Sequence, residues 1–400
     1  MYKTNSKSIL LLCFFTYLTV YVLRVNFSSA MPLLQSQANA SSAFLGMIGS
    51  VFFITYAVGQ LVNGFLADSM SPFRFIIFGL IGTVLANAGI ALCNSLTLIA
   101  VLWAVNGYFQ SIFWASLTRL LSFNFEKRKY SVVATVMSSS MVGGFIIAWV
   151  VLGRVLGGSR WNWFFLVPAF LGTALLAVWI VAAYRLRGHP VPCHKLLIGR
   201  LKESIVFLIR QKVQLICLIC FCLGFVKESI SIWGPTITGY LLGVDIKSSA
   251  LVLLTVPFAN LVGMFLAKGL IDRFKGNEMK TLIFLFGAMA AASVLLFLFQ
   301  ENMVAVTVIL LAAVSAMSYG CNSILLSFIP LMFSKYNLVS TLAGILDFAS
   351  YIGATLSSLV LGMVLTNGNW LSAALIWAAM AAAAVVLCVI TGKKLKRREE

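Results

Sequence analysis

Long apolar runs separated by short polar segments make up almost the whole chain. A helix needs about 20 apolar residues to cross the hydrocarbon core of a bilayer. Runs of that kind are expected near 9–34, 43–67, 75–93, 96–122, 131–153, 161–184, 213–242, 248–270, 280–299, 303–332, 338–365 and 370–391. The pattern therefore predicts an all-α polytopic membrane protein with twelve transmembrane helices in two sets of six.

The only long connection between these runs covers residues 185–212. Its first part, "RLRGHPVPCHK", has the glycine and prolines of a linker, and "KLLIGRLKESIVFLIRQK" mixes basic and apolar residues like a helix lying on a membrane surface. We therefore predict an N-terminal six-helix bundle over 1–184, a cytoplasmic linker with a basic amphipathic segment over 185–212, and a C-terminal six-helix bundle with a basic cytoplasmic tail over 213–400.

The composition excludes an ordinary soluble domain. Apolar residues make up 61% of the chain, charged residues 10%, and the mean hydropathy is +1.01. The net charge of +18 lies in short loops between apolar runs, which indicates lipid topology and not nucleic-acid binding. We expect a multi-pass monomer in contact with membrane lipid, with no nucleic-acid partner, in a cell membrane such as the bacterial inner membrane.

The basic residues predict the orientation of the chain. With the N-terminus in the cytoplasm, 24 of the 29 Lys and Arg residues fall on the inner side, including Arg119 in a connection expected over 119–129. The outer loops hold only Arg154, Arg160 and Lys247. This bias predicts that both termini are cytoplasmic.

Nothing in the sequence points to catalysis. The histidines, His189 and His194, lie in the polar connection, and Cys217, Cys220 and Cys222 have no histidine or carboxylate at ligand spacing. No nucleophile–base pair and no phosphate-cradling glycine loop is recognisable. We expect no enzymatic activity, no catalytic residue, no cofactor and no metal.

An internal repeat relates the two sets of helices. A shift of 203 residues places "VLRVNFSSAMP" on "FVKESISIWGP", so that Arg24 matches Lys227 and Pro32 matches Pro235. Six plus six helices in the same orientation predict parallel repeats about an axis normal to the membrane.

Arg24 and Lys227 are the two cations within predicted helices, where an unpaired charge costs about 2.5–3.5 kcal/mol on insertion scales. Because they are equivalent under the repeat, both are expected to face one central cavity. Two cations that face one cavity predict an anionic ligand. Arginine binds phosphate or carboxylate through its planar guanidinium, and lysine binds an anion as a compact point charge.

Polar side chains continue the faces that carry these cations. Tyr17 and Tyr21 share a helical face with Arg24, and the same spacing recurs in Tyr56, Gln60 and Asn63. Such a stripe forms either a polar interface between helices or the wall of a water-filled cavity.

Two carboxylates also lie in predicted helices, Glu228 and Asp347. Each is either a salt-bridge partner of a cation or an acid that couples transport to protons or to gating. Glu228 adjoins Lys227 in sequence, but neighbours on a helix point about 100° apart.

Over nearly its whole length the chain resembles the major facilitator superfamily. The segments "GFLADSMSPFR" and "GLIDRFKG" look like its loop signature, with Asp68, Arg74, Asp272 and Arg273 as the charged members and Ser69 where an arginine is usual. The resemblance implies a transporter with two six-helix halves.

A closer resemblance is to the organophosphate:phosphate antiporter family. It rests on "YVLRVNFSSAMPLL", "GYFQSIFWASLTRLLSFNFEKRKY" and "FVKESISIWGPTI". The family's second phosphate-binding arginine falls on Lys227, and Gln60 and Ser140 stand where family members have a lysine and a histidine. The substrate-binding residues that this resemblance and the helical faces imply are Arg24, Lys227, Tyr17, Tyr21, Tyr56, Gln60, Trp114, Ser140, Tyr319 and Tyr351.

The resemblance implies a carrier that exchanges a small organic phosphate for inorganic phosphate or another organophosphate. Exchange is also expected on electrostatic grounds. In an empty site the two cations repel each other, and this repulsion opposes the closure of the two halves that is needed to reorient the site. The first alternative is a proton-coupled symporter of a carboxylate or sugar acid, in which Asp347 or Glu228 carries the proton. Leu23 stands where carboxylate-transporting relatives have an acid, which favours phosphate. The second alternative is a sugar-phosphate sensor of the same fold.

Overall fold

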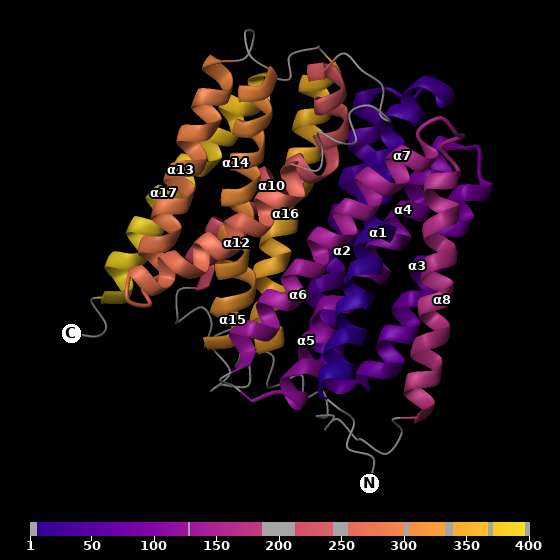
Figure 1. Cartoon of the computed structure of the whole chain (residues 1–400), viewed down its shortest axis with the longest axis horizontal. Helices are drawn as coiled ribbons and strands as arrows, with labels where there is room; N and C mark the ends of the chain where they lie inside the picture. The colour runs from indigo at the N-terminus through magenta and orange to yellow at the C-terminus, as the bar shows by residue number, and fades with distance from the viewer. Residues whose placement is uncertain are drawn as a thin grey trace.

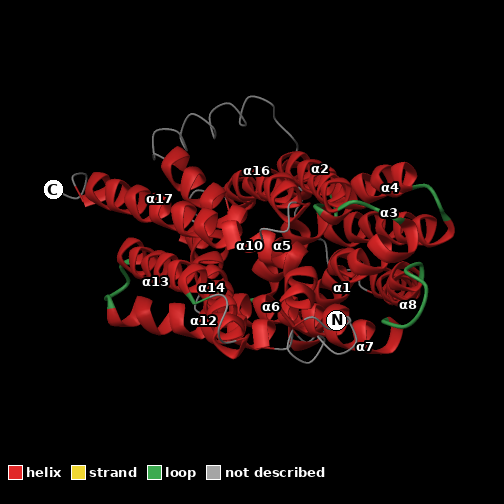
Figure 2. Ribbon diagram, turned by 90° about the horizontal axis from the view of Figure 1, so that it is seen from above, coloured by secondary structure: helices red, strands yellow, loops and turns green. Residues whose placement is uncertain are grey.

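The computed structural model describes residues 6–126, 129–185, 213–242, 255–299, 304–332, 339–366 and 371–396 of the 400-residue chain. All regular structure in these ranges is helical. The helices form two bundles that lie side by side, one coloured indigo to magenta and the other orange to yellow (Figure 1). The same division is seen from above (Figure 2).

The N-terminal bundle contains six helical rods. Two of the rods are broken, one where α4 gives way to α5 at Ser111, and one where a π-helical segment, η2, joins α6 to α7. The elements are α1 (Ser6–Ala38), α2 (Ser42–Ser69), α3 (Pro72–Leu92), α4 (Leu96–Gln110), α5 (Ile112–Asn124), α6 (Tyr130–Phe145), η2 (Ile146–Leu152), α7 (Gly153–Leu156) and α8 (Trp163–Arg185).

The C-terminal bundle repeats this plan with six rods, one of which contains the second π-helical segment, η3. The elements are α10 (Val213–Leu242), α12 (Thr255–Arg273), α13 (Glu278–Leu298), α14 (Val304–Asn322), η3 (Ser323–Phe328), α15 (Ile329–Met332), α16 (Val339–Thr366) and α17 (Leu371–Lys396).

These rods correspond to the twelve predicted spans, so the predicted fold class is confirmed. By length and apolar composition, eleven helices among the described residues can cross a membrane. The described part of the remaining rod, α12, begins at Thr255 and carries Lys268, Asp272 and Arg273 near its end. The predicted amphipathic segment over 186–212 and the tail beyond Lys396 lie outside the described residues. The domain boundaries and the cytoplasmic location of the termini stay predictions.

Local signals in the sequence set several of the helix ends. Ser41 and Ser95 cap α2 and α4 by accepting backbone N–H groups through their hydroxyls, and the side chain of Asn277 caps α13 in the same way. After α1 the backbone turns at Asn39 with φ 52°, a left-handed conformation that asparagine tolerates. These caps keep the connections between rods short.

The outward faces of the bundles are apolar. Large side chains such as Leu85, Leu92 and Phe170 are exposed on them, whereas tryptophans such as Trp179 and Trp377 are buried inside. A hydrocarbon solvent removes the cost of exposing such side chains, so these faces fit direct contact with lipid tails.

A seam between α2 and α16 joins the two bundles. The Ser358 hydroxyl donates to the Gly46 carbonyl at 2.9 Å, and the Ser50 hydroxyl donates to the Thr355 carbonyl at 3.1 Å. The two helices are therefore antiparallel, and Gly46 packs against Gly362. Small residues allow this close backbone approach within a membrane.

Arg119 corrects one part of the orientation argument. It was counted as a loop cation on the inner side, but the structure places it within α5 with only 6% of its surface exposed. Its guanidinium donates to the carbonyls of Ala67 and Met70 at the end of α2. A cation satisfies the free carbonyls at a helix C-terminus, so Arg119 ties α5 to α2. Sequence reasoning assigned it to a loop because the apolar run ends close to it.

Two glycines set the crossing of α10 and α16, the helices that carry the C-terminal charged residues. A Cβ on Gly224 would overlap the backbone carbonyl of Ser350, and a Cβ on Gly353 would overlap that of Phe221. The backbone of each helix therefore packs directly against a glycine of the other helix. This close contact positions the charged residues that lie nearby on α10 and α16.

We expect Gly224→Ala to lower the melting temperature of the purified protein clearly, because the new methyl group meets a backbone carbonyl that cannot rotate away. Overpacking of this kind costs about 1–3 kcal/mol. Gly287→Ala in α13 is the matched control, since nothing lies within 4 Å of its added Cβ. Equal melting temperatures for the two variants, measured in the same detergent, would contradict the close crossing.

Candidate functional site

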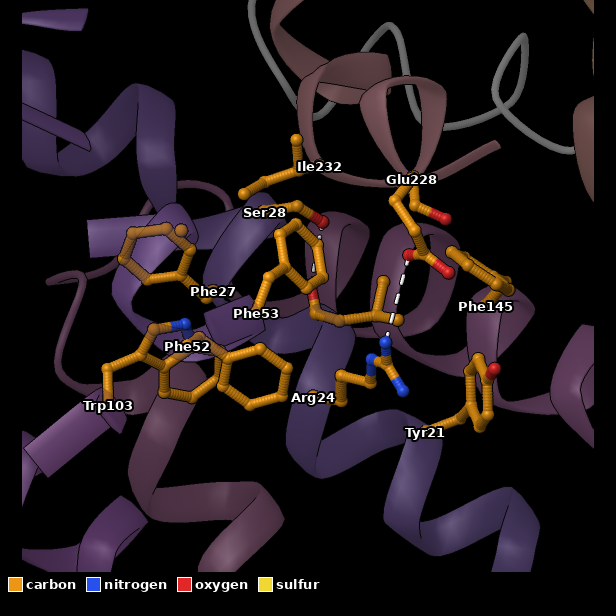
Figure 3. Close-up of a pocket in the computed structure, with 13 residues that line it drawn as sticks. Tyr21, Arg24, Phe27, Ser28, Phe52, Phe53, Trp103, Phe145, Glu228 and Ile232 are labelled. Atoms are coloured by element: carbon orange, nitrogen blue, oxygen red, sulfur yellow. Dashed lines mark hydrogen bonds and ion pairs between the residues drawn. The ribbon is translucent and has the colours of Figure 1, made fainter. Parts of the chain in front are cut away.

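Arg24 lies on the inner face of α1, with 8% of its surface exposed. Its Nη2 donates to the hydroxyl of Tyr351 at 2.6 Å and lies 3.8 Å from Oε2 of Glu228. Figure 3 shows the guanidinium directed toward that carboxylate. Both partners belong to the C-terminal bundle, so this side chain connects the two halves of the molecule.

Aromatic rings surround the rest of the guanidinium. Its carbon lies 4.6 Å from the ring centroid of Tyr56, 4.9 Å from that of Tyr351 and 5.4 Å from those of Tyr21 and Phe52. Ring faces attract a cation, and the attraction grows when water is removed. The rings therefore help to offset the desolvation of Arg24 and hold it in one orientation.

Lys227 lies on α10 with 2% of its surface exposed. Its Nζ is 2.8 Å from Oε1 of Glu228 and donates to Oδ1 of Asn322 at 2.9 Å. It also lies 5.7 Å from the ring centroid of Tyr319. Asn322 ends α14 immediately before η3, and π-helical turns are frequent at functional sites.

Glu228 joins the two cations, because one of its carboxylate oxygens faces Lys227 and the other faces Arg24. Sequence reasoning left open whether Glu228 is a salt-bridge partner, since successive residues diverge around a helix. The long Lys227 side chain reaches the neighbouring carboxylate. The structure therefore shows Glu228 as an ion-pair partner of both cations, and its part in coupling stays a prediction.

Two adjoining cavities border this charged group, and we call them the apolar cavity and the polar cavity. The apolar cavity is lined by Tyr21, Arg24, Val25, Phe27, Ser28, Gly49, Phe52, Phe53, Trp103, Phe145, Glu228, Ser231 and Ile232. The polar cavity is lined by Tyr17, Tyr21, Tyr56, Trp114, Ser138, Met141, Lys227, Asn322, Leu326, Ser327, Asp347 and Tyr351. Tyr21 belongs to both, so the one central cavity expected from the sequence is divided here.

The structure brings most of the predicted site residues together. Nine of the twelve predicted binding and coupling residues line one or both cavities: Arg24, Lys227, Tyr17, Tyr21, Tyr56, Trp114, Tyr351, Glu228 and Asp347. They come from both bundles, as the repeat required.

Three predicted residues line neither cavity. Tyr319 is buried beside Lys227, Ser140 is buried with its hydroxyl donating to the Met137 carbonyl at 2.5 Å, and Gln60 is buried with no partner for its Nε2 among the described residues. Their substrate contact stays a prediction.

The charged residues of the predicted loop signature lie at the ends of helices. Arg74 is exposed in the first turn of α3, and Asp272 and Arg273 are exposed in the last turn of α12. Asp68 belongs to the last turn of α2. Arg74, Asp272 and Arg273 are not among the lining residues of either cavity.

Sequence reasoning missed several lining residues. Asn322 follows Tyr319 by three positions, so the shared helical face could have indicated it. Phe52, Phe53 and Trp103 carried no such signal, because an aromatic residue in an apolar run is equally suited to a lipid face.

The Major Facilitator Superfamily pattern matches residues 13–358. A "Probable hexose phosphate transport protein" of Chlamydia muridarum (strain MoPn / Nigg) is 32% identical over 178 residues, which cover 44% of this chain and 38% of that protein. The matched region thus spans about two fifths of that relative's length.

Other relatives match over most of the chain. The "Membrane sensor protein UhpC" of Escherichia coli (strain K12) is 24% identical over 395 residues, which cover 92% of this chain and 88% of that protein. The "Glycerol-3-phosphate transporter" of Bacillus subtilis (strain 168) is 22% identical over 426 residues, which cover 100% and 95%. Relatives named as transporters and a relative named as a sensor therefore both match this chain.

Among solved structures, a bacterial homologue of the human lysosomal transporter Spinster, in an inward-facing and unoccupied conformation, superposes with a TM-score of 0.68. The sequence identity is 16%, and the match covers 98% of this chain and 96% of that one. This likeness supports the fold.

We expect Lys227→Met to lower the melting temperature strongly, because it leaves Glu228 in a buried position with the more distant Arg24 as its remaining cation among the described residues. Removing one member of a buried pair costs about 3–5 kcal/mol. The double variant Lys227→Met/Glu228→Gln removes both charges of this pair but also takes the carboxylate away from Arg24, so it should recover only part of the loss.

Lys280→Met, at an exposed cation in α13, is the control and should change the melting temperature little. A double variant no more stable than Lys227→Met would show that the two charges do not depend on each other.

Proposed function

The chain belongs to the Major Facilitator Superfamily, and we propose that it carries small phosphate-ester anions across a membrane by alternating access. One observation supports this proposal above the others. Arg24 from one bundle and Lys227 from the other lie buried at the interface of the bundles, and the carboxylate of Glu228 bridges them. An incoming anion can replace that carboxylate on both cations.

The donors around this point suit phosphate. An arginine fork binds two oxygens of a phosphate at once, and a lysine binds a third as a point charge. The hydroxyl of Tyr351 lies beside Arg24 and can donate to the same group, and the ring of Tyr21 borders the guanidinium. Relatives named for hexose phosphate and glycerol-3-phosphate transport support the same substrate class.

The position of the cations also links binding to movement. An anion held by α1 and α10 attracts both bundles toward itself, and so lowers the energy of the closed intermediate between the two open states. Bundles that close over a filled site and reopen on the other side move the anion across the membrane.

Glu228 favours proton symport over exchange as the coupling mode. The exchange argument assumed two bare cations in the empty site, but Glu228 already pairs with both. An empty site of this kind can reorient without a counter-substrate. When phosphate takes the cations, Glu228 is left buried without a partner, and a bound proton removes that charge.

A sensor is the second candidate function, favoured by the relative named as a membrane sensor, which matches 92% of the chain. A sensor and a carrier can share the same cationic site. Saturable binding of glucose 6-phosphate without any uptake into proteoliposomes would support the sensor.

We expect Arg24→Lys and Lys227→Ala to raise the half-saturating concentration for glucose 6-phosphate uptake about 10- to 100-fold, the equivalent of one charge-assisted hydrogen bond. Lys227→Arg should keep most of the uptake, because arginine can still bind the phosphate. The measurement is initial uptake into proteoliposomes, with Lys280→Met as the control. Near-normal affinity in Lys227→Ala would overturn the role of this cation.

Coupling can be tested with proteoliposomes loaded with glucose 6-phosphate. Under symport we expect equal efflux into plain buffer and into buffer with inorganic phosphate, and uptake that accelerates under an inward proton gradient. Glu228→Gln should lose the response to the gradient. Efflux that requires external phosphate, with no effect of the gradient, would establish exchange instead.

A further inference from the structure

Asp347 is a buried acid that the transport of a simple phosphate does not use. It lies on α16, has 7% of its surface exposed and lines the polar cavity together with Lys227. Within the described parts of the chain it forms neither a hydrogen bond nor an ion pair, whereas Glu228 is paired with both cations. A buried carboxylate without a partner either takes up a proton or requires a ligand that supplies the partner.

The walls beside Asp347 are aromatic. The ring centroid of Tyr17 lies 5.0 Å from that of Trp114 and 5.2 Å from that of Tyr21. The ring centroid of Tyr56 lies 4.3 Å from that of Tyr351. All five rings line the polar cavity. Aromatic rings and a carboxylate on the walls of one cavity are the side chains with which aromatic cages bind an ammonium group.

The net charge of the site also indicates a ligand with an ammonium group. The described cavity walls carry two cations, Arg24 and Lys227, and two carboxylates, Glu228 and Asp347, so the empty site is formally neutral. A phosphate dianion that binds with one proton on Glu228 leaves the site with one excess negative charge. An ammonium group on the ligand, placed at Asp347, removes that excess inside the membrane.

We propose that the polar cavity is an ammonium subsite, and that the preferred ligand is a phosphate monoester that also carries an ammonium group. This proposal rests on the proposed function, since the phosphate occupies Arg24 and Lys227. The ammonium group of the ligand then lies against Asp347, in the cavity that Trp114 and Tyr56 also line. Aminoalkyl phosphates and amino-sugar phosphates are members of this class.

Neutral hydroxyl groups are the competing occupant. They can donate to Asp347 and stack on the same rings, as sugars do, but they do not cancel its charge. Ligands that differ only in this group therefore decide between the two occupants.

The test is calorimetric titration of the purified full-length protein with two matched pairs. Glucosamine 6-phosphate is compared with glucose 6-phosphate, and phosphoethanolamine with 2-hydroxyethyl phosphate. We expect the ammonium member of each pair to bind at least tenfold more tightly. Equal affinity within both pairs would overturn the ammonium subsite and leave the phosphate carrier intact, whereas no binding of any of the four would overturn the proposed function.

Asp347→Asn assigns the preference to this carboxylate. The variant should lose the tenfold difference by weakening only the ammonium members, and should bind the hydroxyl members as well as before or better, because one negative charge is gone. Binding of the hydroxyl members shows that the variant is folded. Glu278→Gln in the first turn of α13 is the control and should keep the preference. A preference that survives in Asp347→Asn would overturn the assignment.

Discussion

The cost of holding charged side chains inside a membrane governs the organisation of this protein. Arg24 and Lys227 lie within helices whose other faces contact apolar neighbours, and each is almost fully buried. A carboxylate, an asparagine, a tyrosine hydroxyl and several ring faces compensate them. These partners come from α10, α14 and α16 as well as from α1 and α2, so satisfying two cations determines where five helices meet.

The same compensation makes the interface between the bundles suitable for movement. The α2–α16 seam depends on small residues and on hydroxyl groups that donate to carbonyls, and such contacts can slide without exposing charge. The central contact between Arg24 and Glu228 is longer, at 3.8 Å, and joins two flexible side chains. In the proposed function, this long ionic contact between flexible side chains breaks when a bound anion replaces the Glu228 carboxylate on Arg24, and the two rigid halves can then separate.

The division of the site into two cavities separates two tasks. Arg24 and Glu228 line the apolar cavity, Lys227 lines the polar cavity, and Tyr21 lines both; in the proposed function the anionic group binds between the two cations. The apolar cavity is lined by phenylalanines and Trp103, whereas the polar cavity adds tyrosines, serines and Asp347. The remainder of a ligand therefore meets mainly phenylalanine and tryptophan rings on the apolar side, where Glu228 and two serines also lie, and mainly tyrosines with Asp347 on the polar side.

Sequence alone determined the helical architecture and the charged residues of the site. Apolar runs and a repeat at an offset of 203 are visible along the chain, and a cation such as Arg24 stands out because membrane insertion penalises it. Only the tertiary structure decided which residues meet. Glu228 reaches Arg24, Asn322 reaches Lys227 and Arg119 reaches the end of α2 because helices distant in sequence pack together, and such packing follows from close contacts that no local pattern encodes.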